Sequence, residues 1–166
     1  IFEKCWARLM AKLGYQVSLP KEVVWLNGAP GSGKGANTPF IMNTVSASRV
    51  YPVSQLLQDH AESQELIAAG DMVPDGFVLL ALLEKLLDPA YGGLGGCTLV
   101  VDGFPRTTLQ VDLVWLLYEK LMEVHRARSQ SMTHRGIKLP HPRFKTVILY
   151  VDEATSLQRQ LSRGAE

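Results

Sequence analysis

The sequence predicts an α/β protein of three layers, in which helices cover both faces of a mostly parallel β-sheet. Two observations support this prediction. Short apolar runs alternate along the chain with longer segments of helical periodicity, the order that is typical of a parallel sheet. The runs at 22–26 and 98–101 are apolar at nearly every position, as expected for strands that are buried on both faces.

The overall composition is that of a globular protein with one domain. The chain has 166 residues, of which 46% are hydrophobic and 20% are charged, and this length suffices for a single hydrophobic core. The 17 lysines and arginines against 16 acidic residues leave a net charge of +1, which does not favour nucleic acid as a partner. The longest apolar stretch, 77–87, contains Glu84 and Lys85 and is too short to cross a bilayer. We therefore expect no nucleic-acid partner and no membrane span.

The two cysteines, Cys5 and Cys97, have neither CxxC spacing nor the spacing of a metal site. Two isolated thiols predict an intracellular, reducing compartment, without distinguishing cytoplasm, plastid and mitochondrion. The sequence starts at Ile1 rather than Met and stops at Glu166 within an expected helix, so we expect it to be part of a longer protein.

The first expected element is a helix over 1–13. One side of this helix is apolar at helical spacing, with Ile1, Phe2, Cys5, Trp6, Leu9, Met10 and Leu13. Lys4, Arg8 and Lys12 lie together beside this stripe, one turn apart. We interpret this basic flank as the solvated face of a packed helix; the alternative is a surface that docks a protein partner or a membrane.

The core is expected over 22–166, after an N-terminal helical extension at 1–21. Apolar runs predict its strands and helical periodicity predicts its helices, with Gly, Pro and Ser positions between them. The expected strands are 22–26, 49–53, 98–101 and 146–151. The expected helices are 34–44, 54–69, 74–87, 108–128 and one that starts at Asp152 or Glu153, with loops at 88–97 and 129–145. The helices near 54–88 should form an inserted subdomain, and the basic loop at 129–145 is a second place at which we consider a protein partner.

A glycine-rich loop between the first core strand and the first core helix matches the pattern GxxxxGK. Its glycines allow backbone N–H groups to turn toward phosphate oxygens, and the positive end of the helix dipole points at the same place. Lys34 adds a mobile positive charge for the β- and γ-phosphates of a nucleotide. The expected residues of this ATP-phosphate site are Gly28, Ala29, Pro30, Gly31, Ser32, Gly33, Lys34, Gly35 and Ala36.

A second motif, DGFPRT at 102–107, follows the strand expected at 98–101. In the first motif, Gly35 follows Lys34 where most such loops have the Ser or Thr that holds Mg²⁺. Together, GxPGxGKG and DGFPRT resemble the adenylate kinase family of nucleoside-monophosphate kinases, and the resemblance covers about residues 22–163. It implies the P-loop NTPase fold, Mg²⁺ as cofactor, ATP and AMP as substrates, and transfer of the γ-phosphoryl group of ATP to AMP. In that family the inserted helical subdomain binds the nucleoside monophosphate.

The resemblance also assigns roles to individual residues. Asp102 would orient water molecules on Mg²⁺, the metal being held through water and phosphate. Arg106 offers a planar fork of donors to the acceptor phosphate, and Gly103 lets the backbone approach a ligand closely. Gln110, one helical turn after Arg106, stands where the family reads the adenine of AMP. The expected catalytic residues are Lys34, Asp102, Arg106 and Arg163.

The acceptor half of the pattern is only partly matched. Val53, Gln55 and Gln58 stand where the family has Thr, Asp and the Arg that clamps the phosphate of AMP. Losing one charged hydrogen-bonding partner costs about 1.5–3 kcal/mol. Ala36 likewise replaces a Thr of the phosphate-binding loop, whereas 69–75 resemble the AGxLVxD segment whose backbone lines the adenine pocket. The expected residues around AMP are Val53, Gln58, Asp71, Met72, Val73, Gly103, Arg106 and Gln110.

After the helix that starts near residue 153, the family continues with a mobile lid, a last strand and its helix, and these are absent from the 166 residues. Arg163 resembles the first arginine of that lid. Two alternatives to an AMP kinase remain. One is a catalytically weak, kinase-derived module that binds nucleotide or serves as a scaffold in a larger assembly, and the other is a kinase of the same fold that uses UMP or CMP.

Overall fold

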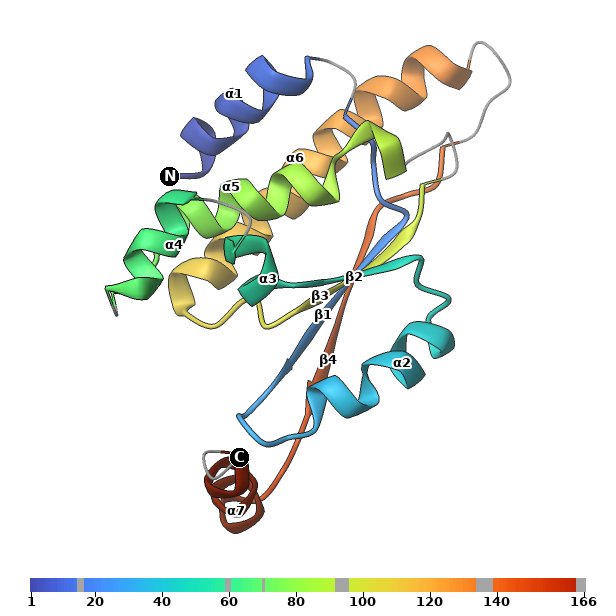
Figure 1. Ribbon diagram of the computed structural model, residues 1–166. Helices are drawn as coiled ribbons and strands as arrows, with labels where there is room; N and C mark the ends of the chain where they lie inside the picture. Colours follow the sequence, from blue (N-terminus) through green and yellow to red (C-terminus); the bar gives the residue numbers. More distant parts are fainter. Residues whose placement is uncertain (15–16, 59–60, 70, 92–95, 134–138, 164–166) are drawn as a thin grey trace.

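The computed structural model describes residues 1–14, 17–58, 61–69, 71–91, 96–133 and 139–163. Its sheet has four strands, all parallel, in the order β2-β3-β1-β4 (Figure 1). The strands are β1 Glu22–Gly28, β2 Arg49–Pro52, β3 Thr98–Asp102 and β4 Arg143–Leu149. The prediction of an α/β fold with parallel strands is confirmed.

Helices lie on both faces of this sheet. They are α1 Phe2–Leu13, α2 Lys34–Thr44, α3 Val53–Gln58, α4 Ala61–Ala68, α5 Asp75–Leu86, α6 Thr108–Thr133 and α7 Glu153–Arg163, with a short 3₁₀ turn at Pro89–Tyr91. α2 covers one face, whereas α1, α5 and α6 lie on the other (Figure 1), which gives the three layers that the sequence predicts. Within the ranges described, no helix is both long and apolar enough to cross a bilayer.

The side chains of β1 alternate between two hydrophobic cores. Val23 and Trp25 belong to the larger core, which they share with α1, α5 and α6. Val24 and Leu26 belong to the smaller core, beside α2. All four are at most 2% exposed. Because successive residues of a strand face opposite sides of the sheet, a continuous apolar run is what two covered faces require.

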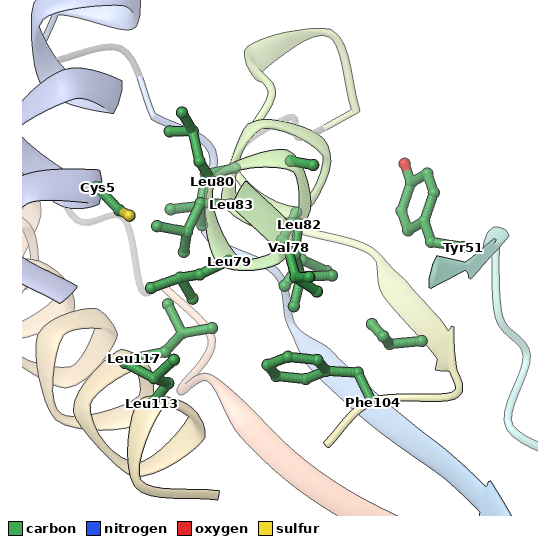
Figure 2. Packing of buried hydrophobic residues seen from close by; sticks show 14 of the residues in the cluster. Cys5, Tyr51, Val78, Leu79, Leu80, Leu82, Leu83, Phe104, Leu113 and Leu117 are labelled. Atoms are coloured by element: carbon green, nitrogen blue, oxygen red, sulfur yellow. The ribbon is translucent and has the colours of Figure 1, made fainter. Parts of the chain in front are cut away.

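α5 lies at the centre of the larger core. Figure 2 shows its leucines between α1, which contributes Cys5, and α6, which contributes Leu113 and Leu117. Leu82 of α5 is fully buried. Burying one such side chain stabilises the fold by about 1.5–3 kcal/mol. α5 is therefore a structural element of the core as well as part of the insertion that we predict at 54–88.

α1 is held on the core by its apolar side, where Phe2, Cys5, Trp6 and Leu9 are buried. Lys4 and Arg8 are exposed, and Lys12 forms an ion pair with Glu84 of α5 over 3.0 Å. An ion pair near the surface contributes at most about 1 kcal/mol, so apolar burial dominates the attachment of α1. Lys4 and Arg8 thus lie on the exposed side of a packed helix, and a partner or membrane surface for this flank stays a prediction.

β4 begins at Arg143 rather than at residue 146 and ends at Leu149 rather than at residue 151, which corrects its predicted bounds. The side chain of Glu22 on β1 is only 4% exposed, and its carboxylate lies 3.0 Å from Lys145 Nζ and 3.4 Å from Arg143 Nε. A buried charge is tolerated when it is paired. Arg143 and Lys145 therefore occupy strand positions although their charge suggested a loop.

α6 also differs from its predicted bounds, since it continues to Thr133 instead of ending at residue 128. Near this end, Arg128 Nη1 donates to the carbonyl of Val17 over 2.6 Å, which attaches the helix to the segment before β1. The first part of the loop predicted at 129–145 is therefore helical. Residues 134–138 of that loop lie outside the described part of the chain, and its role in binding a partner stays a prediction.

Candidate functional site

The predicted phosphate-binding loop joins the end of β1 to the start of α2. Gly31 and Gly33 have φ angles of +77° and +84°, in the left-handed region that favours glycine. The Ser32 N–H donates to the carbonyl of Ala29 over 3.0 Å, and the Asn37 N–H donates to that of Gly33 over 3.0 Å. α2 therefore begins directly at the loop. Its N-terminus brings to the loop the N–H groups that a helix leaves unpaired and the positive end of the helix dipole.

Lys34, the first residue of α2, folds back over the loop. Its ammonium group donates to the carbonyl of Gly28 over 2.7 Å, so the positive charge lies across the loop. Gly35 and Ala36 follow in exposed positions of the helix. A Cβ on Gly35 would meet no atom within 4 Å, so steric crowding does not explain why a hydroxyl-bearing residue is missing there.

Two buried polar atoms at this site, Ser32 Oγ and Asp102 Oδ1, have no hydrogen-bonding partner within the described ranges. Asp102 ends β3 opposite Leu26 of β1, and the Gly103 N–H donates to the carbonyl of Leu26 over 3.0 Å. A buried polar atom without a partner is costly. A phosphate oxygen would satisfy the hydroxyl, and water bound to Mg²⁺ would satisfy the carboxylate. The residues present therefore fit a nucleotide phosphate and a hydrated magnesium ion.

The loop after β3 places Arg106 beside Gly103. Arg106 Nε donates to the carbonyl of Gly103 over 2.6 Å. Gly103 has a φ of +86°, and a Cβ at this position would collide with the guanidinium of Arg106. Asn27 Nδ2 donates to the carbonyl of Phe104 over 3.2 Å and joins the loop to the end of β1. Glycine is thus required at residue 103 both by the backbone and by the space that Arg106 occupies.

Gln110 is only 8% exposed, and both ends of its amide are bound. Its Oε1 accepts from the N–H of Arg106 over 2.7 Å, and its Nε2 donates to Asp75 Oδ1 over 2.6 Å. These two partners fix the orientation of the amide and join α6 to the start of α5. The sequence pointed to Gln110 and, as the last residue of the segment at 69–75, to Asp75, but it did not predict that the two side chains are bonded to each other.

α7 packs against the phosphate-binding loop. Ser156 Oγ donates to the carbonyl of Pro30 over 2.7 Å, and Arg159 Nη1 donates to that of Gly31 over 2.8 Å. Asp152 caps the helix by accepting a backbone N–H one turn on, over 2.9 Å, and this hydrogen bond lowers the pKa of its carboxyl group below the ordinary value. Sequence reasoning missed Ser156 and Arg159, because their partners are backbone carbonyls far away in the chain and leave no motif.

A cleft of about 1260 Å³ brings predicted phosphate-binding and acceptor-side residues together. Its walls include Gly28, Pro30, Lys34, Gly103 and Arg106. Aromatic side chains of α6 and β4, among them Trp115, Tyr118 and Phe144, line another part. Two other residues are predicted to be catalytic: Asp102, which ends β3, and Arg163, which ends α7. The side chain of Arg163 lies outside the described part of the chain.

Six residues predicted around AMP are not among those that line this cleft. One of them is Gln110, whose amide is held by Arg106 and Asp75. Val53 is 6% exposed within the larger core, and Gln58 is exposed at the end of α3. Asp71 and Met72 are exposed between α4 and α5, and Val73 packs partly buried against the larger core. None of these other five residues lines the cleft beside Arg106, and their contact with an acceptor stays a prediction.

No protein-family model matches the chain. The chain is 30% identical over 147 residues to an adenylate kinase of Trichodesmium erythraeum, an alignment that covers 84% of this chain and 68% of that relative. It is 27% identical over 146 residues to an adenylate kinase of Parasynechococcus marenigrum, covering 84% of this chain and 67% of the relative. With an adenylate kinase of Chlamydia pneumoniae it shares 33% identity over 106 residues, covering 59% of this chain and 46% of the relative. The chain thus spans from about half to about two thirds of the length of these relatives.

Proposed function

Because this chain belongs to the adenylate kinase family, we propose that it transfers the γ-phosphoryl group of ATP to AMP with the help of Mg²⁺. The observation that supports this proposal best is the common cleft whose walls contain both Lys34 and Arg106. These residues follow β1 and β3, which are neighbouring parallel strands. The crevice at the carboxyl ends of such strands is where open α/β sheets bind ligands.

On the donor side, the N–H groups at the start of α2 would bind the phosphates of ATP, aided by the positive end of the helix dipole. Lys34 would exchange its hydrogen bond with the neutral carbonyl of Gly28, 2.7 Å away, for bonds to phosphate oxygens that carry negative charge. Because the attraction between opposite charges then adds to the hydrogen bond, this exchange favours the bound state.

On the acceptor side, Arg106 would hold the phosphate of the monophosphate with its planar guanidinium. Its Nε is already fixed by the carbonyl of Gly103, which leaves the two terminal nitrogens for the ligand. Holding both phosphates in one cleft would let the attacking oxygen approach the γ-phosphorus opposite the leaving oxygen, so that no covalent intermediate is needed. Catalysis then consists of positioning and charge stabilisation.

Asp102 would hold the water shell of Mg²⁺, because its Oδ1 is buried and has no hydrogen-bonding partner among the described residues. When bound, the metal neutralises charge on the phosphate oxygens. Asp102 lies at the end of β3, one residue before Gly103, and is thus close to the backbone that lines the cleft.

The second candidate function is a module of the same fold that binds ATP with little turnover. The position of Gln58 favours it, because this exposed, uncharged residue stands at the end of α3 where the family has its phosphate-clamping arginine. A UMP or CMP kinase is a third candidate, since the amide of Gln110 is engaged by Asp75 and Arg106 and the base-reading contact is therefore not preset for adenine.

A coupled assay of ADP formation tests these proposals, with the protein as it is expressed naturally and with Lys34→Ala as control. ATP would be offered with AMP, UMP and CMP in separate reactions. ADP formation with AMP that disappears in Lys34→Ala supports the AMP kinase. Turnover with UMP or CMP but not with AMP would support the UMP or CMP kinase instead. ATP binding without turnover of any monophosphate would contradict both kinase proposals and support the nucleotide-binding module.

A further inference from the structure

The first turns of α7 pack directly on the phosphate-binding loop. Ser156 is 9% exposed and Gly31 of the loop is buried. A Cβ on Gly31 would lie 2.9 Å from the carbonyl oxygen of Ser156 and 3.4 Å from Cβ of Arg159. Contacts below 3.0 Å are not tolerated by a real Cβ, so the helix and the loop fit together only because residue 31 is glycine.

A directed hydrogen bond crosses this contact. Ser156 Oγ donates to the carbonyl of Pro30 over 2.7 Å. The same oxygen accepts from Gln160 Nε2 over 3.1 Å. A serine hydroxyl has a single proton to donate. Because Gln160 Nε2 donates to Ser156 Oγ, the hydroxyl proton of Ser156 remains available for the carbonyl of Pro30. This hydrogen bond fixes the Pro30 carbonyl in an orientation toward α7.

The orientation of the Pro30 carbonyl determines where the next N–H points. In a trans peptide unit the C=O and N–H bonds point in opposite directions, and the cis bond of the described chain is Phe104–Pro105. The Gly31 N–H therefore points away from α7. Arg159 Nη1 holds the following carbonyl, that of Gly31, in the same way over 2.8 Å.

We propose that Ser156 is a positioning residue for the donor phosphates, because its hydroxyl orients the Pro30–Gly31 peptide unit so that the Gly31 N–H is presented to ATP. This inference rests on the proposed binding of ATP by the loop. Ser156 acts through the backbone and touches no reacting atom. A donor that is preset for the ligand avoids reorganisation when the phosphates bind, which is the general source of affinity from preorganisation.

The test compares Ser156→Thr with Ser156→Val, two variants of the same shape that differ in the hydroxyl group. Dissociation constants for MgATP and for inorganic tripolyphosphate are measured by calorimetry, together with that for AMP and the unfolding temperature. Ser156→Thr should bind both polyphosphates within about twofold of the native protein, whereas Ser156→Val should bind them about three- to tenfold more weakly, the effect of one lost hydrogen bond. AMP binding should be the same in both variants.

Ser162→Val is the matched control. Ser162 is an exposed serine of the same helix, and its hydroxyl donates to the carbonyl of Gln158 over 3.0 Å, away from the loop. Its substitution should leave polyphosphate binding unchanged.

Equal polyphosphate affinity of the Ser156→Thr and Ser156→Val variants would overturn the role of Ser156 without contradicting the proposed function. Parallel losses of ATP, AMP and thermal stability in Ser156→Val would also overturn it, because they indicate general destabilisation. Failure of the native protein to bind either polyphosphate would overturn this inference and the proposed function together.

Discussion

Gln110 Nε2 on α6 donates a hydrogen bond to Asp75 Oδ1 at the start of α5, over 2.6 Å. Together with the bond from the Arg106 N–H to Gln110 Oε1, it connects the loop after β3 to a helix that lies at the centre of the larger core. Any acceptor base that Gln110 reads must replace one of these bonds or share it. The geometry of the acceptor side is therefore linked to the packing of α5.

Asp75→Ala should lower the free energy of unfolding by about 1–3 kcal/mol, because it leaves the buried amide of Gln110 without its acceptor. Asp75→Asn keeps an acceptor oxygen and should cost less. Asp112→Ala, at an exposed aspartate of α6, is the control and should stay within about 0.5 kcal/mol of the native protein. Denaturant unfolding measures all three, and equal stability of Asp75→Ala and Asp112→Ala would contradict the structural role of Asp75.

Two glycine substitutions should have opposite effects on the stability of the protein. Gly103→Ala should destabilise the protein by about 1–3 kcal/mol, since residue 103 has a φ of +86° and its Cβ would displace the guanidinium of Arg106. Gly76→Ala should raise stability by about 0.5–1 kcal/mol, because residue 76 lies in the first turn of α5 and its Cβ would make only an ordinary contact of 3.7 Å with Ile1. Thermal unfolding distinguishes them; a Gly103→Ala variant as stable as the native protein would show that Arg106 is not held as described.

Gln58→Arg should strengthen AMP binding about ten- to a hundredfold, because it supplies one charged hydrogen-bonding partner at the position where the family has its phosphate clamp. Gln58 is exposed, so the longer side chain can be accommodated without repacking. Gln130→Arg adds the same charge at an exposed position of α6 and serves as control. AMP affinity is measured by calorimetry, and equal changes in both variants would indicate a general charge effect instead of a specific contact.

Both thiols should be slow to alkylate at pH 8. Burial raises the pKa of Cys5 above its ordinary value, outweighing the nearby charge of Arg8, and burial likewise raises the pKa of Cys97. The fold favours the neutral thiols, so their contribution to stability is complete below the ordinary pKa of a thiol and falls as pH rises through the raised pKa values. The thiolate is the reactive form. Iodoacetamide should therefore modify the native protein more slowly than the denatured one, and equal rates would contradict the burial of these groups.

The positions of Lys34, Asp102 and Arg106 were predictable because each belongs to a motif that directly follows a buried strand, and parallel strands end at the same edge of a sheet. The start of β4 was not predictable, since Arg143 and Lys145 indicate a loop until the buried carboxylate of Glu22 is placed beside them.

The contacts that α7 and α5 make with the site were also not predictable from the sequence. Ser156 binds a backbone carbonyl 126 positions away, and a residue of any type could supply that acceptor. Gln110 and Asp75 are 35 positions apart on different helices, so neither periodicity nor a local motif relates them. The sequence therefore predicts the chemistry of a motif better than the neighbours that hold it in place.

The central claim is that the loop at 28–36 binds the phosphates of ATP through Lys34. Calorimetric titration of the protein with MgATP tests it most directly, in the native form, in Lys34→Ala and in Lys4→Ala, an exposed lysine of α1. The account predicts binding by the native protein and by Lys4→Ala, and affinity reduced about ten- to a hundredfold in Lys34→Ala, the effect of losing one charged hydrogen-bonding partner. MgATP affinity that is the same in all three forms, or absent from the native protein, would contradict it.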